Sequence, residues 1–107
     1  MGDTRIKESK FQNEVIKFLK DKGCYVIKYW GGGKFTKAGV PDLLVSCNGK
    51  FLGIELKAPK GRPSKLQLYN LDLINNSGGI GILLYPKDFE KFKEKINAIL
   101  SLKNWRV

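Results

Sequence analysis

The stretch that decides the fold runs from Val40 to Ala58 and reads VPDLLVSC-NG-KFLGIELKA. Asn48-Gly49 separates two apolar runs, and Asn-Gly is typical of a two-residue type I′ turn because both turn positions need positive φ. A two-residue turn also fixes the register of the two strands. We therefore expect a β-hairpin with these facing pairs: Cys47 and Lys50, Ser46 and Phe51, and, further along, Asp42 and Glu55.

This register brings two carboxylates together at the open end of the hairpin. Because strand side chains alternate, Glu55 and Lys57 share one face, while the apolar residues between and before them take the other. Like charges directly opposite each other destabilise a sheet, and Lys57 alone offsets them only modestly. A divalent metal ion held by both Asp42 and Glu55 compensates better, so we predict a metal site here.

Composition and charge narrow the classes of function. The 107 residues suffice for one compact domain, and no repeat or linker divides them. Twenty Lys and Arg against ten Asp and Glu give a net charge of +10, which favours nucleic acid first and an anionic membrane surface second. There is no run of about 18 apolar residues and no N-terminal signal core, so we expect an intracellular protein. Cys24 and Cys47 are expected to be buried, reduced thiols.

Histidine is absent from the sequence. This excludes Ser-His-Asp and Cys-His catalysis, nucleases that use histidine, and zinc sites with histidine ligands. Any hydrolytic chemistry must come from carboxylates, lysine and a hard metal ion that prefers oxygen ligands.

The apolar pattern predicts further elements around the hairpin. Before the hairpin we expect a helix over about residues 7–22, which ends at Gly23, and a strand over 24–30. After it we expect a helix from Ser64 to about residue 77, a strand over 80–85 and a last helix from Pro86. Ser64-Lys65-Leu66-Gln67 fits a capping box that opens the second helix, so Gln67 has a purely structural explanation beside any functional one. The order αβββαβα predicts an α/β fold with one mixed sheet; the role of residues 101–107 stays undetermined.

The first helix carries two candidate acids. Glu8 falls near the middle of the inward-facing stripe, and Glu14 lies toward its edge. A glutamate in the first turn also favours the helix dipole, so spacing alone leaves a structural and a functional role for Glu8 equally open.

Two basic loops flank the proposed site, over residues 31–39 and 59–64. Glycine admits a close approach of phosphate and the cations supply charge, although a plain linker would explain the first loop equally well. We predict DNA contacts from Lys34, Lys37, Lys60, Arg62 and Lys65. The lysines from Lys87 to Lys95 alternate with glutamates and indicate a solvated helix face instead.

The pattern Pro41-Asp42, twelve residues, then Glu55-Leu56-Lys57 resembles the PD-(D/E)xK nuclease superfamily, whose αβββαβ core has the predicted order. With Glu8, residues 39–43 and 53–59, and Gln67, the chain resembles the VRR-NUC (virus-type replication-repair nuclease) family from about Glu8 to Tyr85. Its length is similar to the stand-alone form of phages and bacteria, so residues 1–107 are expected to form one such domain.

The resemblance implies a restriction-endonuclease-like core with an added C-terminal helix. It implies a Mg²⁺- or Mn²⁺-dependent endonuclease for branched DNA, a four-way junction or a flap, with Holliday junction resolvases as close relatives, DNA repair as the setting and a homodimer as the assembly. If the protein is encoded by a phage, the resemblance implies that the nuclease acts in the cytoplasm of the bacterial host. The implied catalytic residues are Glu8 (or Glu14), Asp42, Glu55, Lys57 and Gln67, and the implied metal ligands are Asp42, Glu55 and the backbone carbonyl of Leu56.

Three alternatives differ from this hypothesis. A non-catalytic basic DNA-binding module would bind DNA through charge alone and would not cleave it. A restriction endonuclease normally needs base-reading elements beyond the core, for which 107 residues leave little room. A membrane-surface protein fits worst, because the helices interleave acidic and basic residues and bury their apolar faces.

Overall fold

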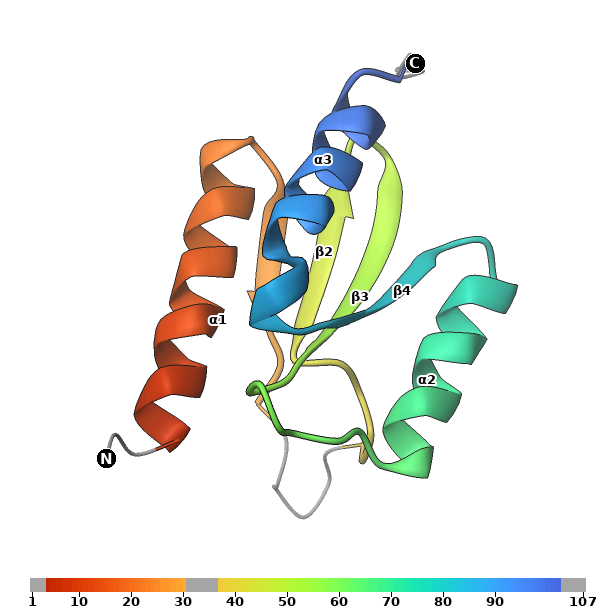
Figure 1. The fold of residues 1–107 in the computed structure, drawn as a ribbon. Coiled ribbons are helices and arrows are strands. Elements are labelled where there is room, and N and C mark those ends of the chain that lie inside the picture. Colours follow the sequence, from red (N-terminus) through yellow and green to blue (C-terminus); the bar gives the residue numbers. More distant parts are fainter. Residues whose placement is uncertain (1–3, 31–36, 103–107) are drawn as a thin grey trace.

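The computed structural model describes residues 4–30 and 37–102, with side chains from Ser9 onward. The elements follow one another as α1 (Thr4–Asp21), β1 (Tyr25–Lys28), β2 (Leu43–Cys47), β3 (Lys50–Leu56), α2 (Lys65–Asn76), β4 (Ile80–Leu84), the short 3₁₀ helix η1 (Pro86–Asp88) and α3 (Phe89–Leu100) (Figure 1). This order confirms the predicted α/β class and the restriction-endonuclease-like core with its C-terminal helix. Within the described ranges, no helix has the length and apolar character needed to cross a bilayer.

The sheet is mixed, with strand order β1-β2-β3-β4. The first two pairings are antiparallel and β3 pairs with β4 in parallel. Cys47 faces Lys50 and Ser46 faces Phe51, as the hairpin turn predicted. Both turn residues have positive φ, 50° at Asn48 and 82° at Gly49. The Asn48 amide also donates hydrogen bonds to the carbonyls of Ile99 (2.8 Å) and Leu102 (2.9 Å), which attaches the turn to the end of α3.

Several boundaries differ from the predicted ones by a few residues. The regular strand β2 begins at Leu43 rather than Val40, because Pro41 has no N–H to donate to a ladder. The pairing nevertheless continues irregularly, since the Tyr29 N–H donates to the Asp42 carbonyl at 2.8 Å. At the last helix, Pro86 starts a turn of 3₁₀ helix, and the α-helix follows from Phe89.

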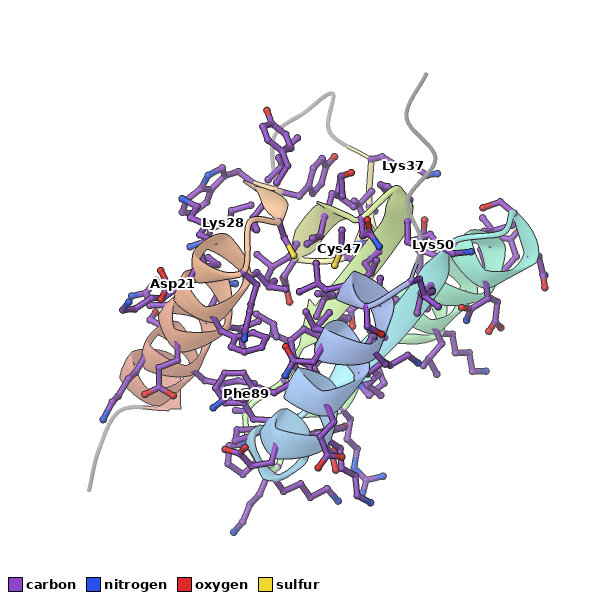
Figure 2. The ribbon with its side chains drawn as sticks, turned by 90° about the horizontal axis from the view of Figure 1, so that it is seen from above. Asp21, Lys28, Lys37, Cys47, Lys50 and Phe89 are labelled. Carbon is purple, nitrogen blue, oxygen red and sulfur yellow. The ribbon has the colours of Figure 1, made fainter. Side chains whose placement is uncertain are left out.

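Helices α1 and α3 cover one face of the sheet and enclose the main core. Phe11, Val15 and Leu19 of α1 pack there with residues of α3 and with one side of each strand. The Phe89 ring lies between the two helices, edge-on to Phe11 with 5.6 Å between ring centroids (Figure 2). Both cysteines, Cys24 and Cys47, are free and buried, as expected.

Helix α2 covers part of the opposite face and approaches the sheet closely at two glycines. Gly53 of β3 and Gly81 of β4 are direct neighbours in the parallel register. A Cβ atom at Gly81 would lie 2.5 Å from the backbone oxygen of Leu71, and one at Gly53 would overlap the Cδ1 methyl of Ile74. The absence of side chains at this pair therefore sets the distance between α2 and the sheet.

We expect Gly81→Ala to lower the free energy of unfolding by about 1–3 kcal/mol, the usual cost of overpacking. The new methyl group would meet the α2 backbone, which cannot rotate away. Gly53→Ala is the matched control and should cost less, because it meets side chains, the Ile74 methyl and the Pro41 ring at 3.1 Å, rather than backbone. Urea denaturation of both variants measures the difference, and equal costs would show that the backbone contact does not limit the packing of α2.

Candidate active site

Three side chains of the predicted site meet at the open end of the β2–β3 hairpin. Leu43 pairs with Ile54, so the next step of the same register sets Asp42 opposite Glu55. The Leu56 N–H donates to Asp42 Oδ2 at 2.8 Å and holds that carboxylate against β3. The ammonium group of Lys57 lies 3.4 Å from Glu55 Oε2. The hairpin thus brings Asp42, Glu55 and Lys57 together.

Glu55 is the unusual member of this cluster. Its side chain is buried, with the residue 2% exposed, and among the described residues its Oε1 atom finds no hydrogen-bond partner. The pKa of Glu55 is raised from 4.5 to about 7, mainly by burial and next by the charge of Asp42, while Lys57 opposes the shift. A buried carboxylate without full compensation takes up either a proton or a cation.

The donor set fits a hard divalent cation. The described residues hold no group of three or more His, Cys, Asp and Glu side chains, so within the described structure the site offers the two carboxylates of Asp42 and Glu55. Mg²⁺ is usually bound by one or two carboxylates and keeps several waters. Glu55 Oε1, which has no hydrogen-bond partner in the described structure, supplies an oxygen that such an ion can take.

The candidate acids of the first helix lie in different surroundings. Glu8 belongs to the N-terminal part of α1, whose start lies at the same end of the sheet as the C-terminal end of β3 (Figure 1), and its side chain is outside the described structure. Glu14 is exposed and lines a groove formed by residues of α1 and α3, without any residue of the hairpin. This arrangement favours Glu8, and the assignment stays a prediction.

Gln67 forms the predicted capping box. Its N–H donates to Ser64 Oγ at 3.1 Å, and its Oε1 accepts from the Ser64 N–H at 2.9 Å. The side-chain oxygen is therefore engaged at the helix start, and a role toward the carboxylates would fall to the amide nitrogen.

Four of the five predicted DNA-contacting cations lie in the described structure, three of them in the turns around the site and Lys65 at the start of α2. Lys37, Lys60, Arg62 and Lys65 are all exposed, and Lys34 falls outside the described residues. One residue that the sequence did not single out holds Lys37 in place. The Tyr29 hydroxyl accepts a hydrogen bond from the Lys37 N–H at 2.9 Å and lies 3.2 Å from the Lys37 carbonyl oxygen, which it reaches as donor.

Comparison with known proteins agrees with the predicted nuclease family. The sequence model of the family Hjc, archaeal Holliday junction resolvase, matches residues 3–75. The chain belongs to this family. The matched segment contains Asp42, Glu55, Lys57 and Gln67, and it ends before β4 and α3. A search of the curated proteins finds no match.

Two solved structures share the fold. A structure described as a VRR_NUC domain has a TM-score of 0.66 and 25% sequence identity, covering 82% of this chain and 95% of its own. Archaeoglobus fulgidus Hjc, described as a Holliday junction resolvase from an archaeal hyperthermophile, has a TM-score of 0.55 and 21% identity, covering 74% of this chain and 69% of its own. The predicted resemblance to VRR-NUC proteins within the PD-(D/E)xK superfamily is confirmed, and the protein is a nuclease of the Holliday-junction-resolvase type.

We expect the metal-free protein to lose stability relative to Glu55→Gln as the pH rises. The folded state holds a proton on Glu55 up to a pKa of about 7, whereas in the unfolded chain the same carboxyl has its ordinary pKa of 4.5. Below pH 4.5 Glu55 is protonated in both states, so the two proteins should differ little with pH. Above pH 7 the buried charge lowers the free energy of unfolding of the wild type by up to about 3 kcal/mol. Thermal melts with a chelator from pH 4.5 to 8 measure this difference.

Glutamine has the shape of the protonated acid, so the variant controls for every other titrating group. A difference in melting temperature that stays constant over this pH range would show that Glu55 ionises normally. At pH 8, Mn²⁺ is expected to raise the melting temperature of the wild type and to leave Glu55→Gln nearly unchanged.

Proposed function

We propose that this protein is a Mg²⁺- or Mn²⁺-dependent endonuclease that hydrolyses phosphodiester bonds in branched DNA, at a four-way junction or a flap, inside the cell. The observation that carries the proposal is the buried oxygen Glu55 Oε1, without a partner in the described structure, beside a second carboxylate and a lysine. Membership of the resolvase family supports the junction as substrate. The charge of +10 supports a polyanionic partner.

Asp42, Glu55 and the backbone carbonyl of Leu56 would hold the metal ion. The bound ion would supply positive charge to the scissile phosphate and lower the pKa of a coordinated water. The protein's part is to keep both carboxylates in place. The Leu56 N–H fixes Asp42, and burial fixes Glu55. At neutral pH the ion would replace the proton that the raised pKa of Glu55 otherwise retains.

Lys57 would act on the water and on the phosphate. Its ammonium group lies on the same face as Glu55, close enough to orient a nucleophilic water and to offset charge on the phosphorus oxygens. Glu8 and the Gln67 amide would hold further waters around the site. Lys34, Lys37, Lys60, Arg62 and Lys65 would contact phosphates and place the junction.

We expect Asp42→Asn and Glu55→Gln to reduce junction cleavage by orders of magnitude and to leave junction affinity equal or tighter. Each change keeps the shape of the side chain and removes one negative charge, so the metal ion is lost while repulsion of the phosphate falls. Lys57→Ala should abolish cleavage but keep Mn²⁺ binding, because lysine is not a metal ligand at neutral pH. Single-turnover cleavage, DNA binding and Mn²⁺ titration separate these effects.

Two results would contradict the assignment. Cleavage near the wild-type rate in Asp42→Asn or Glu55→Gln would remove the active site from this hairpin. A wild-type protein that binds the junction but never cuts it with Mg²⁺ or Mn²⁺ would be a DNA-binding module. A thermal melt of each variant identifies loss of activity through misfolding.

We also propose that the protein acts as a homodimer, since two symmetric cuts in a junction need two active sites. An apolar surface supports this proposal. On the face that α2 only partly covers, Tyr25, Ile27 and Phe51 of the strands are exposed. Along α2, the exposed residues Leu66, Tyr69 and Leu73 lie on one stripe, and Leu66 packs toward Gly39, ahead of β2.

Two copies that each carry +10 repel each other, so their contact requires a surface without charge. Large exposed apolar surfaces of this kind mark sites of association. A surface that joins the outer strands to one side of α2 therefore suits a second copy of the chain.

We expect Leu73→Arg to convert the dimer into a monomer at micromolar concentration, because the new charge would be buried against an apolar surface. Leu68→Arg is the matched control. Leu68 has the same 42% exposure as Leu73 but lies on the far side of α2, in another groove. Sedimentation without DNA measures the oligomeric state of both variants and of the wild type. A monomeric wild type, or dissociation by Leu68→Arg alone, would contradict this surface.

A further inference from the structure

A second groove lies beside the active site and is not part of it. Its one wall is the turn of residues 59–63 that follows Lys57. Its other wall comes from Leu68 of α2 and from Tyr85 and Lys87, which follow β4. The groove therefore joins a loop that the family match includes to a segment beyond residue 75, where that match ends.

Residues that line the groove also contact Lys57, the proposed catalytic lysine. Tyr85 follows Leu84, and the Lys57 N–H donates to the Leu84 carbonyl at 3.0 Å, so Lys57 and Tyr85 are neighbours one strand spacing apart. The Tyr85 hydroxyl donates to the Gly61 carbonyl at 2.8 Å and fixes the turn. A Cβ atom at Gly61 would lie 3.4 Å from the Lys57 side-chain methylenes, so this turn packs on the lysine stem.

The charges in the groove have one sign. Among the described residues that line it, Lys60, Arg62 and Lys87 are the ionisable side chains apart from the Tyr85 phenol, and the others are apolar or glycine. The Lys87 ammonium lies 5.8 Å from the centre of the Tyr85 ring. Cations beside apolar side chains in an open groove suit a sugar-phosphate backbone, whose phosphates bind the cations while its sugars contact the apolar side chains.

We propose that this groove holds the backbone of the DNA strand next to the scissile phosphate, with Lys87 as a phosphate contact. The inference rests on the proposed nuclease function, because the strand is placed by its distance from Lys57. The proposal also gives Lys87 a different role from the other lysines near α3. The sequence pattern had assigned all the lysines from Lys87 to Lys95 to a solvated helix face. Lys87 precedes α3 and points into the groove, whereas Lys91 and Lys95 are exposed on the helix and outside the lining.

The test measures binding of a fluorescent four-way junction without divalent metal, as a function of salt. Loss of one phosphate contact weakens binding roughly five- to tenfold at about 0.1 M salt and reduces the slope of log K against log[salt] by about 1. We expect both changes in Lys87→Ala. We expect neither in Lys91→Ala, which removes the same charge one helical turn away.

A second measurement locates the strand. An iron chelate tethered to Lys87→Cys should cut the junction strands within a few nucleotides of the wild-type cleavage position, and one tethered to Lys91→Cys should not. Equal affinities and slopes for the two alanine variants, or tethered cuts spread along the arms, would overturn the proposal. If the wild type never cleaves DNA, the nuclease proposal fails; if it cleaves while Lys87→Ala binds normally, only the groove assignment fails.

Discussion

The register of the β2–β3 hairpin is the constraint on which the rest of the site depends. The Asn48-Gly49 turn pairs Cys47 with Lys50, and every later pair follows from that step. A slip of one residue would move Asp42 away from Glu55 and exchange the buried face of β3 for its polar face. The same alternation that buries Leu52, Ile54 and Leu56 under α1 and α3 directs Glu55 and Lys57 to the other side. Core packing and site geometry therefore have one origin.

Glu55 lowers the stability of the fold when its carboxylate is ionised. A carboxylate that is 2% exposed, beside Asp42, raises the free energy of the folded state whenever it is ionised. Lys57 offsets this only in part, since one carboxylate oxygen still finds no partner in the described structure. A protein selected for stability alone would place an apolar residue here. The acid at this position supports the proposal that a cation binds beside Glu55.

Helix α2 connects the site to its surroundings. Gly53 and Gly81 let the helix lie close to β3 and β4, which fixes where its capped N-terminus and the basic turn before it stand. One side of α2 then borders the open apolar surface of the outer strands, and the other side borders the groove beside Lys57. The two glycines thus position a surface suited to a second copy of the chain and a surface suited to DNA on opposite sides of one helix.

The sequence by itself determined the order of elements, the hairpin register and the cluster of Asp42, Glu55 and Lys57, because turn chemistry and side-chain alternation are local properties that nearby residues decide. It also determined the capping box at Ser64 and Gln67. Only the tertiary structure decided that Tyr29 holds Lys37, that Tyr85 holds the turn against Lys57, and that Lys87 differs from Lys91. Those contacts join residues on separate strands and loops, and their partners depend on how the sheet and α2 pack rather than on any spacing along the chain.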